Sequence, residues 1–440
     1  MRQAQLAAAR GDWLAAAASY QQAAKLSPRD ANLQIQLGAA LAQAHQFTSA
    51  IAGFQAALKL SPRNSAAEVA LAQAYRSVHN FEEARRILER AAREHPRQAP
   101  PLSVLGDIDL ELQTYDASIK HLTAALALDP ANTDTRNRLA TAYKEKGDSA
   151  NALAQLAKVL ARDPKNALAC YLRAEVEADH NDDAAALRDA EKVLDLQPQN
   201  RPGRVLLGKI LVRIPAEMPP ADATARCQRA AQVLESASAE KPGDSETLFL
   251  LSRAYRCAAQ PGKARDALAA FEKASQNDRA AGEGEKQARH LVQDANDRAL
   301  KNDFSGALDL LQQALEKNPH SGAAYSQLAK LYYSAGDIDR AADAASKALA
   351  IAPYEPDFLY VQGTILERQG KLAEALASFT QTTLVNPKES DAYFEIGAIY
   401  EHLHDRPRAI AAYKKAVALS PDDPDYRRAL ASLTANPPPH

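Results

Sequence analysis

The chain has 440 residues, a formal net charge of −2 and an aromatic content of 6%. With no global basic excess, the composition indicates neither nucleic acid nor an anionic membrane as the partner. No apolar run approaches the ~20 residues that a membrane-spanning helix needs.

Prolines recur at a fixed interval along the chain, and neighbours within each of two series lie 34 residues apart. Proline ends helices because it has no N–H to donate and its ring clashes with the preceding turn. The series are Pro28, Pro62, Pro96, Pro130, Pro164 and Pro198, and then Pro319, Pro353, Pro387 and Pro421. An internal period of this length overrides the usual division into two or three domains and predicts one array of repeats.

The stretch from Ala31 to Asn64 shows the repeat most clearly. Its apolar and small residues fall three and four apart, which predicts two amphipathic helices with a break at His45. Gly38 is small where the two helices must cross, whereas Phe54 supplies volume between them. We therefore expect Gly38→Leu to overpack the crossing and cost roughly 1–3 kcal/mol.

The period breaks twice in the middle of the chain. The seventh unit, 201–244, is ten residues too long, and its prolines predict an extended loop inserted at 214–223. The eighth unit lacks its closing proline, and Gly282 and Gly284 follow it. Because each glycine costs ~1 kcal/mol relative to alanine inside a helix, we favour an irregular joint at 279–287, with an extended helix as the alternative.

These breaks define the expected organisation of the chain. An N-terminal block of eight repeats covers 1–278, the joint or extended helix covers 279–287, and a C-terminal block of four repeats covers 288–423. Residues 424–440 read as a short helix that caps the last apolar face, followed by a tail.

Small residues recur at fixed positions before the prolines, as at Ala50, Ala84 and Ala152, and the first helices share a pair such as Leu37-Gly38. With these features and the proline series, the chain resembles the tetratricopeptide repeat family. This resemblance implies an all-α fold, a right-handed solenoid of stacked antiparallel helix pairs. It also implies that the first helix of each pair lines a concave groove that binds protein segments. A lysine at the fifth position, which begins a carboxylate clamp in chaperone-binding members, occurs in no unit.

Chemistry by this chain alone is not indicated. The sequence contains no Gly-rich phosphate loop, H-E-x-x-H or G-x-S-x-G motif. Cys170, Cys227 and Cys257 lack C-x-x-C spacing, so we expect buried thiols rather than a disulfide or a zinc site. We therefore predict no enzyme activity, no cofactor and no metal.

The resemblance places positions 2, 5, 9, 12 and 13 of each unit in the groove. In the fourth and sixth units the residues there include the acidic Asp107, Glu111, Glu175 and Asp179, and in the seventh and eighth units they include the basic Lys209, Arg213, Arg253 and Arg256. These residues predict a groove that is acidic before Arg201 and basic after it. Aromatic residues at these positions are Tyr171, Phe249, Tyr333, Tyr360 and Phe394. A groove that changes sign would orient a bound chain by electrostatic complementarity.

The leading hypothesis is thus a scaffold that binds protein or peptide partners, which the resemblance places in bacterial envelope or polysaccharide assembly. The alternatives are a regulatory or targeting region of a larger enzyme, and a self-assembling solenoid, although a monomer is favoured. Met1 falls at the fifth position of the first repeat, so the start of a helix is missing. We expect the cytoplasm by default, and the periplasm or a membrane anchor if a signal segment was removed.

Overall fold

The computed structural model describes residues 2–435, and within this range it contains 24 α-helices and no β-strand. The chain divides into two compact units, Met1–Ile87 with Ala281–His440 and Leu88–Ala280. The tail expected after 435 lies outside the described residues.

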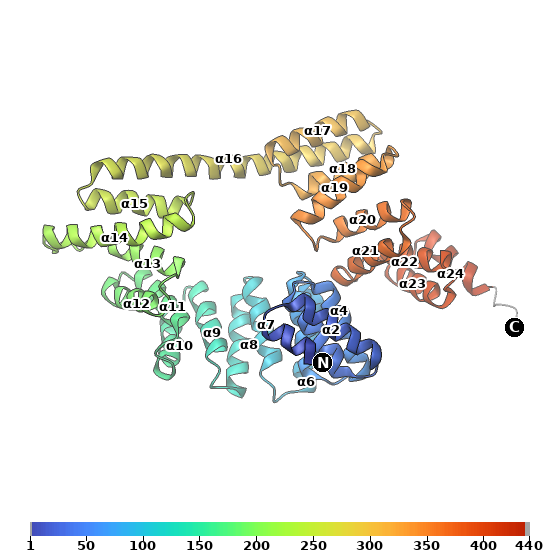
Figure 1. Ribbon diagram of the computed structural model, residues 1–440, viewed down its shortest axis with the longest axis horizontal. Coiled ribbons are helices and arrows are strands. Elements are labelled where there is room, and N and C mark those ends of the chain that lie inside the picture. Colours follow the sequence, from blue (N-terminus) through green and yellow to red (C-terminus); the bar gives the residue numbers. More distant parts are fainter. Residues whose placement is uncertain (1, 436–440) are drawn as a thin grey trace. The chain divides into compact units, whose positions relative to one another are not determined.

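The helices follow the expected pairs through both compact units (Figure 1). The first unit contains α1 (Arg2–Ala9), α2 (Trp13–Leu26), α3 (Ala31–Gln43), α4 (Phe47–Leu60), α5 (Ser65–Ser77), α17 (Phe304–Lys317), α18 (Gly322–Ser334), α19 (Ile338–Ile351), α20 (Pro356–Arg368), α21 (Leu372–Val385), α22 (Ser390–His402), α23 (Arg406–Leu419) and α24 (Pro424–Ala435). The second contains α7 (Pro100–Glu111), α8 (Tyr115–Leu128), α9 (Thr133–Glu145), α10 (Ser149–Arg162), α11 (Ala167–Asp179), α12 (Asp183–Leu196), α13 (Arg201–Leu211), α14 (Pro220–Glu240) and α15 (Ser245–Cys257). The divisions between the units fall within α6 (Phe81–Glu94) and α16 (Pro261–Leu300).

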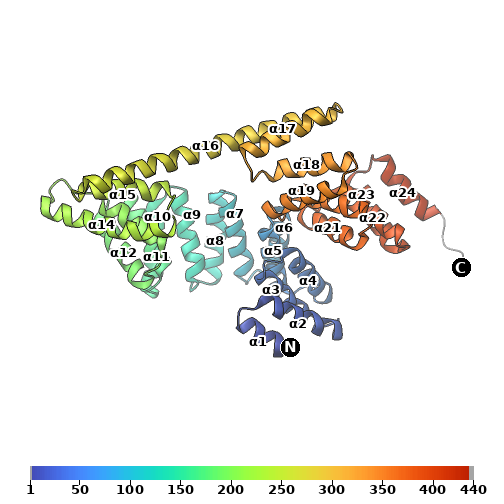
Figure 2. The same cartoon turned by 45° about the horizontal axis from the view of Figure 1, so that its top comes forward.

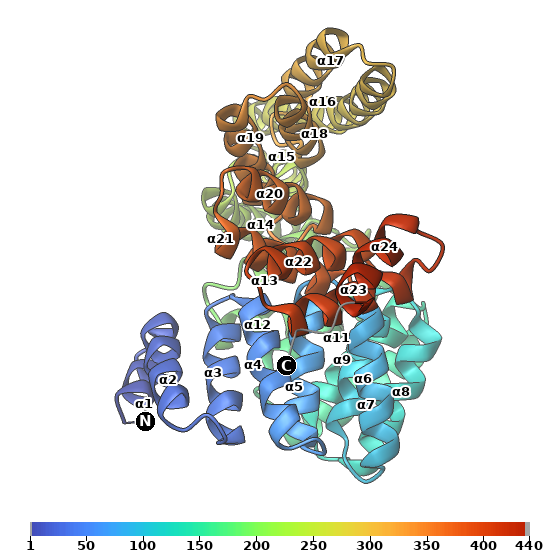
Figure 3. The same cartoon turned by 90° about the vertical axis from the view of Figure 1, so that its right-hand side faces the viewer.

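Each helix packs on its partner and on the next pair, which makes the fold an all-α solenoid. Figure 2 shows α7, α8 and α9 side by side, and Figure 3 shows the same arrangement for α3, α4 and α5. The apolar residues that face these neighbours are almost all buried, and they include many alanines. Small side chains allow close approach of the helices, as the repeat pattern predicted.

The helix crossing expected at Gly38 is as close as the sequence indicated. A Cβ placed on Gly38 would lie 2.8 Å from ring carbons of Phe54, closer than real Cβ atoms come to their neighbours. The eighth position of other units repeats this geometry, since a Cβ on Gly106 would overlap Leu122 and one on Gly363 would lie 2.6 Å from Phe379. Glycine at this position therefore lets a large side chain of the second helix lie directly against the backbone of the first.

A tight turn joins the two helices of every unit except the seventh. One residue of this turn takes a left-handed conformation, with φ between 55° and 85°. The residues are Gly11, His45, His79, Gln113, Gly147, Asn181, Ala259, Asn302, Gly336, Gly370 and His404. The next N–H then bonds back across the helix end, as from Asp148 to the Tyr143 carbonyl at 2.8 Å. This bonding satisfies carbonyl groups that the helix end leaves unpaired.

The seventh unit differs because Pro215 occupies the position of the left-handed residue. The proline ring fixes φ near −65°, so the tight turn cannot form there. A non-helical segment, 212–219, replaces it, and α14 begins at Pro220. The irregular stretch is therefore shorter than the expected 214–223, since 220–223 are helical, and α14 has 21 residues against 14 in α2 or α4.

The favoured joint at 279–287 is not formed, and the alternative, an extended helix, is what the structure shows. The 40-residue helix α16 runs through both glycines without interruption. A Cβ on Gly284 would lie 2.5 Å from the carbonyl oxygen of Lys317, the last residue of α17, whereas one on Gly282 would meet nothing within 4 Å. Gly284 thus permits a close helix contact and does not act as a hinge.

The expectation of three thiols is wrong for two of the cysteines. Cys227 on α14 and Cys257 at the end of α15 form a disulfide, with their Cα atoms 5.7 Å apart. Cys170 is a buried free thiol, as expected. Because the bonded residues are 30 positions apart on helices of successive repeats, motif spacing along the sequence does not reveal the pair.

Candidate protein-binding surfaces

The first helices of the repeats carry the expected groove residues except Arg213, which lies beyond the end of α13. In the second compact unit several of the charged ones are already paired. Asp107 on α7 forms an ion pair with Arg138 on α9, at 3.0 Å. On α11, Glu175 accepts from Lys144 of α9 at 2.8 Å. The acidic half of the predicted groove is therefore partly neutralised by cations from the neighbouring repeat.

Tyr171 extends this pairing into a short network. Its hydroxyl donates to Glu175 at 2.8 Å, and burial, with the added effect of this carboxylate, raises the pKa of the tyrosine. Lys144 was not among the groove residues predicted from the sequence. It could have been, because Lys144 stands at the twelfth position of its unit, one of the positions that the resemblance assigns to the groove. Of the other acidic residues, Glu111 and Asp179 lie exposed near the ends of α7 and α11.

The basic residues after Arg201 fall into two groups. Arg213 donates to the carbonyl of Ala178 at the end of α11 and pairs with Asp183 on α12 at 3.1 Å, so it joins two repeats. Lys209 on α13 and Arg253 are half-buried, whereas Arg256 is exposed. None of these three makes an ion pair with another residue that the structure describes.

We call Lys209, Arg253 and Arg256 the basic cluster, since α13 and α15, which carry them, are in contact. Phe249 lies on α15 with 41% of its surface exposed, and its ring centroid is 5.2 Å from that of Phe271 on α16. The cluster thus combines unpaired positive charge with an accessible aromatic side chain, a combination that suits an acidic segment.

The first compact unit contains a cavity of about 470 Å³ on the first helices of three successive repeats. We call it the tyrosine pocket. Its walls come from α18, α20 and the start of α22, and two of the predicted groove residues, Tyr333 and Tyr360, line it. The remaining lining residues are Lys330, Ser334, Pro356, Asp357, Val361, Thr364, Ile365, Glu389 and Asp391.

Acidic side chains dominate the charge of the tyrosine pocket. Asp357 pairs with Lys330 at 2.7 Å and accepts from the Ser326 hydroxyl at 2.9 Å. Glu389 accepts from the Asn386 amide at 3.0 Å, and Asp391 accepts from the Tyr426 hydroxyl. Only Lys330 offsets the three carboxylates of the lining, so the pocket keeps a net negative charge.

A further carboxyl group lies next to this pocket. The Tyr360 hydroxyl is 3.4 Å from Glu395 on α22. Burial, together with the nearby charge of Glu367, raises the pKa of Glu395 to about 7. A cation bound beside it would favour the ionised form of this carboxyl.

The fifth aromatic residue of the predicted groove, Phe394, packs against other rings. Its ring stacks on Tyr426 of α24 at a centroid distance of 4.9 Å and lies 5.4 Å from Tyr413 of α23. Phe394 therefore fixes the capping helix to the last repeat. The sequence predicted the helix but not that it would contact this side chain.

Comparison with known families agrees with the helix-pair geometry. Two family models described as tetratricopeptide repeat match the chain, one at residues 1–65 and 360–424, the other at 41–107, 109–176 and 299–363. Together these segments cover more than half of the sequence. The chain belongs to the tetratricopeptide repeat family. Neither model matches 177–298, the part of this tetratricopeptide repeat protein that holds segment 212–219, the disulfide and most of α16.

Among solved structures, this tetratricopeptide repeat chain is similar to one described as a crystal structure of the APC/C hetero-tetramer Cut9-Hcn1. The two are 12% identical, the match covers 98% of this chain and 95% of the other, and the TM-score is 0.36. Such a match carries no information about partners. No curated protein matches the chain.

Among residues 2–435, no helix is long and apolar enough to cross a membrane. Within the same range, no group of three or more His, Cys, Asp or Glu side chains could hold a metal ion. Tetratricopeptide repeats suggest a protein interaction scaffold.

Proposed function

We propose that this chain is a non-enzymatic scaffold that binds segments of partner proteins on the first helices of its repeats. The tyrosine pocket is the observation that carries the proposal. Three consecutive first helices wall it, and its volume of about 470 Å³ is large enough for one or two side chains. Rigid stacked helices offer such a surface to an extended or helical segment without rearrangement.

The charge of the pocket favours a basic side chain from the partner. Lys330 is already paired with Asp357, which leaves Glu389 and Asp391 as carboxylates without a cationic partner in the lining. The faces of Tyr333 and Tyr360 would add a cation–π attraction to a guanidinium or ammonium group. We infer a partner segment that carries arginine or lysine next to an apolar residue.

The experiment is a peptide-display selection on the immobilised full chain, followed by affinity measurement of the enriched peptides by fluorescence anisotropy. Peptides that bind the tyrosine pocket should carry a basic residue flanked by apolar ones. Glu389→Lys should weaken their binding at least tenfold, because it places a positive charge in the pocket. Tyr360→Ala should weaken binding as well, through loss of the aromatic wall.

A charge-matched control is available on the same compact unit. Asp343 lies on α19, where it pairs only with Lys347 one turn away, and both side chains are more than half exposed. Asp343→Lys should leave the affinity of the selected peptides unchanged. A selection that enriches no peptide would contradict the scaffold proposal, and equal effects of Glu389→Lys and Asp343→Lys would contradict the assignment to this pocket.

The setting in bacterial envelope or polysaccharide assembly is a further part of the proposal, and it rests on the family resemblance. Fractionation of cells that make the protein naturally tests it. Detection in the envelope fraction would support this setting, and detection only in the cytoplasm would contradict it.

A further inference from the structure

The disulfide lies where the seventh repeat departs from the others. When the C-terminal ends of α14 and a 14-residue second helix such as α12 are aligned, Cys227 matches the first residue of the shorter helix. The residues of α14 before Cys227 are therefore an N-terminal extension. In several other units this position holds a large aromatic residue that begins the second helix, such as Trp13, Phe47 or Tyr115. The seventh unit has a covalent bond to Cys257 there instead.

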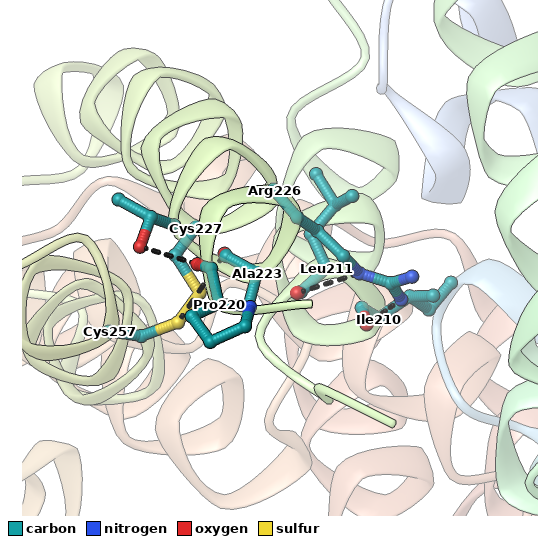
Figure 4. The surroundings of a disulfide bond; sticks show 8 residues. Ile210, Leu211, Pro220, Ala223, Arg226, Cys227 and Cys257 are labelled. Carbon is teal, nitrogen blue, oxygen red and sulfur yellow. Dashed lines mark hydrogen bonds between the residues drawn. A yellow bond between two sulfur atoms is a disulfide. The ribbon is translucent and has the colours of Figure 1, made fainter. Parts of the chain in front are cut away.

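Two neighbouring residues fasten the extension of α14 to the helices on either side (Figure 4). Arg226 donates to the carbonyl oxygens of Leu211 at 3.1 Å and Ile210 at 3.0 Å, which satisfies the last turn of α13. Cys227 then bonds to Cys257, the last residue of α15. These contacts stand in for the tight turn that Pro215 prevents.

The spacing of the two cysteines in the backbone suits a disulfide. The Cα separation of 5.7 Å is near the middle of the range that disulfides occupy. Cys227 is fully buried, and the Cys257 sulfur lies 3.8 Å from the Ala223 carbonyl oxygen of the extension. Cys170 is fully buried on α11, so it does not compete as a partner.

We propose that Cys227 and Cys257 are oxidised to a disulfide in the working protein, and that the chain therefore functions in an oxidising compartment. Disulfides form and persist outside the reducing cytosol, where thiol reductants would open them. This revises the default cytoplasmic expectation, and it stands independently of what the tyrosine pocket binds.

The oxidant is a protein or small-molecule disulfide that accepts two electrons. Cys257 is the more accessible of the two sulfurs, so its thiolate attacks the oxidant and releases one oxidant thiolate. The Cys227 thiolate then attacks the mixed disulfide at Cys257, forming the internal bond and releasing the second oxidant thiolate. Two protons leave the cysteines, and the oxidant is reduced to a dithiol if both of its sulfurs belong to one molecule, or to two thiols if they do not.

Thiol trapping tests the proposal in cells that make the full-length protein naturally. Cells are quenched in acid, and the denatured protein is alkylated before and after reduction and weighed by mass spectrometry. The expected result is one alkylated thiol per chain before reduction, at Cys170, and three after it. Cys170→Ala is the matched control and should give none before reduction and two after it.

Alkylation of all three cysteines before reduction would overturn the proposal, because it would mean that the pair is a dithiol in its natural compartment. Peptide mapping identifies the alkylated positions. A bond that joins Cys170 to either of the other cysteines would overturn it too.

Discussion

At the scale of single residues, the turn between paired helices shows how one backbone angle sets the repeat. Seven of its left-handed positions are not glycine, although a left-handed conformation costs other residues about 1–2 kcal/mol. Glycine occupies this turn position at Gly11, Gly147, Gly336 and Gly370, but the bonding of the turn holds other residues there as well. Proline is excluded because its ring fixes φ near −65°, which is why Pro215 ends the regularity.

Gln113 provides a direct test of this cost. It lies exposed at φ 58°, and glycine adopts that angle without steric penalty. We expect Gln113→Gly to stabilise the chain by about 1 kcal/mol, measured as a higher urea midpoint. Gly147→Ala, at the equivalent turn position of the next repeat, should lower the midpoint by a similar amount. Midpoints that move in the same direction would contradict this explanation.

Glu395 gives a prediction about pH. Its pKa is raised from 4.5 to about 7 in the folded chain, so the folded state binds more protons than the unfolded state between these values. Stability should therefore fall as pH rises from 4.5 to 7. Allowing for solvent screening at this half-buried site, we expect Glu395→Gln to stabilise the chain by about 1–2 kcal/mol at pH 8.5 and by little at pH 5. Equal differences between variant and parent at both pH values would exclude this origin.

At the scale of elements, α16 shows that two glycines in a helix can have opposite meanings. Composition alone treats both as breaks, because glycine lowers helix propensity wherever it stands. The structure separates them: Gly282 faces open space, and Gly284 faces the end of α17. The contact partner of Gly284 lies more than 30 residues away in sequence, so the local pattern could not distinguish the two glycines.

We expect the same substitution to have opposite effects at Gly282 and Gly284. Gly282→Ala should stabilise the chain by about 1 kcal/mol, through helix propensity alone. Gly284→Ala should destabilise it by roughly 1–3 kcal/mol, because the new Cβ would overlap the Lys317 carbonyl oxygen. Thermal unfolding followed by circular dichroism measures both. A stabilising Gly284→Ala would show that α16 does not pack on α17 as described.

The disulfide belongs to the same scale, since it ties together two helices of the irregular middle. A bond that closes a loop of this length is worth about 3–4 kcal/mol in the chain-entropy treatment. The destabilisation should concentrate around segment 212–219, which lies outside the helices. We expect Cys227→Ala with Cys257→Ala to speed tryptic cleavage after Arg213 at least tenfold. Cys170→Ala, treated in parallel, measures the effect of losing a cysteine elsewhere.

At the scale of the whole molecule, the repeat period allowed the fold to be predicted, and long-range pairing limited prediction of the site. Fixed proline spacing and amphipathic patterns are local signals, so helix pairs and the capping helix follow from them. The sequence also shows which groove positions carry a charged residue, but it does not show whether that charge is neutralised by a neighbouring repeat. The ion pairs of Asp107 with Arg138 and of Glu175 with Lys144 form between adjacent repeats, so only the structure shows them.

This pairing changes the predicted charge pattern of the binding surfaces. The basic cluster on the second compact unit remains unpaired with any other described residue, whereas the tyrosine pocket on the first has an acidic lining. Because the two surfaces differ in charge, we expect them to bind separate ligands or separate segments of one ligand. Acidic segments suit the basic cluster, and basic segments suit the tyrosine pocket.

Charge reversal of the basic cluster should therefore affect one class of ligand only. Arg253→Glu with Arg256→Glu should weaken binding of acidic peptides selected on the full chain at least tenfold, because neither arginine is paired with a described residue whose loss would complicate the result. Basic peptides that depend on Glu389 should bind with unchanged affinity, and the far-ultraviolet circular dichroism should stay the same. Equal loss of both ligand classes would contradict the assignment of acidic ligands to the basic cluster, and no loss of acidic ligands would remove the cluster from binding.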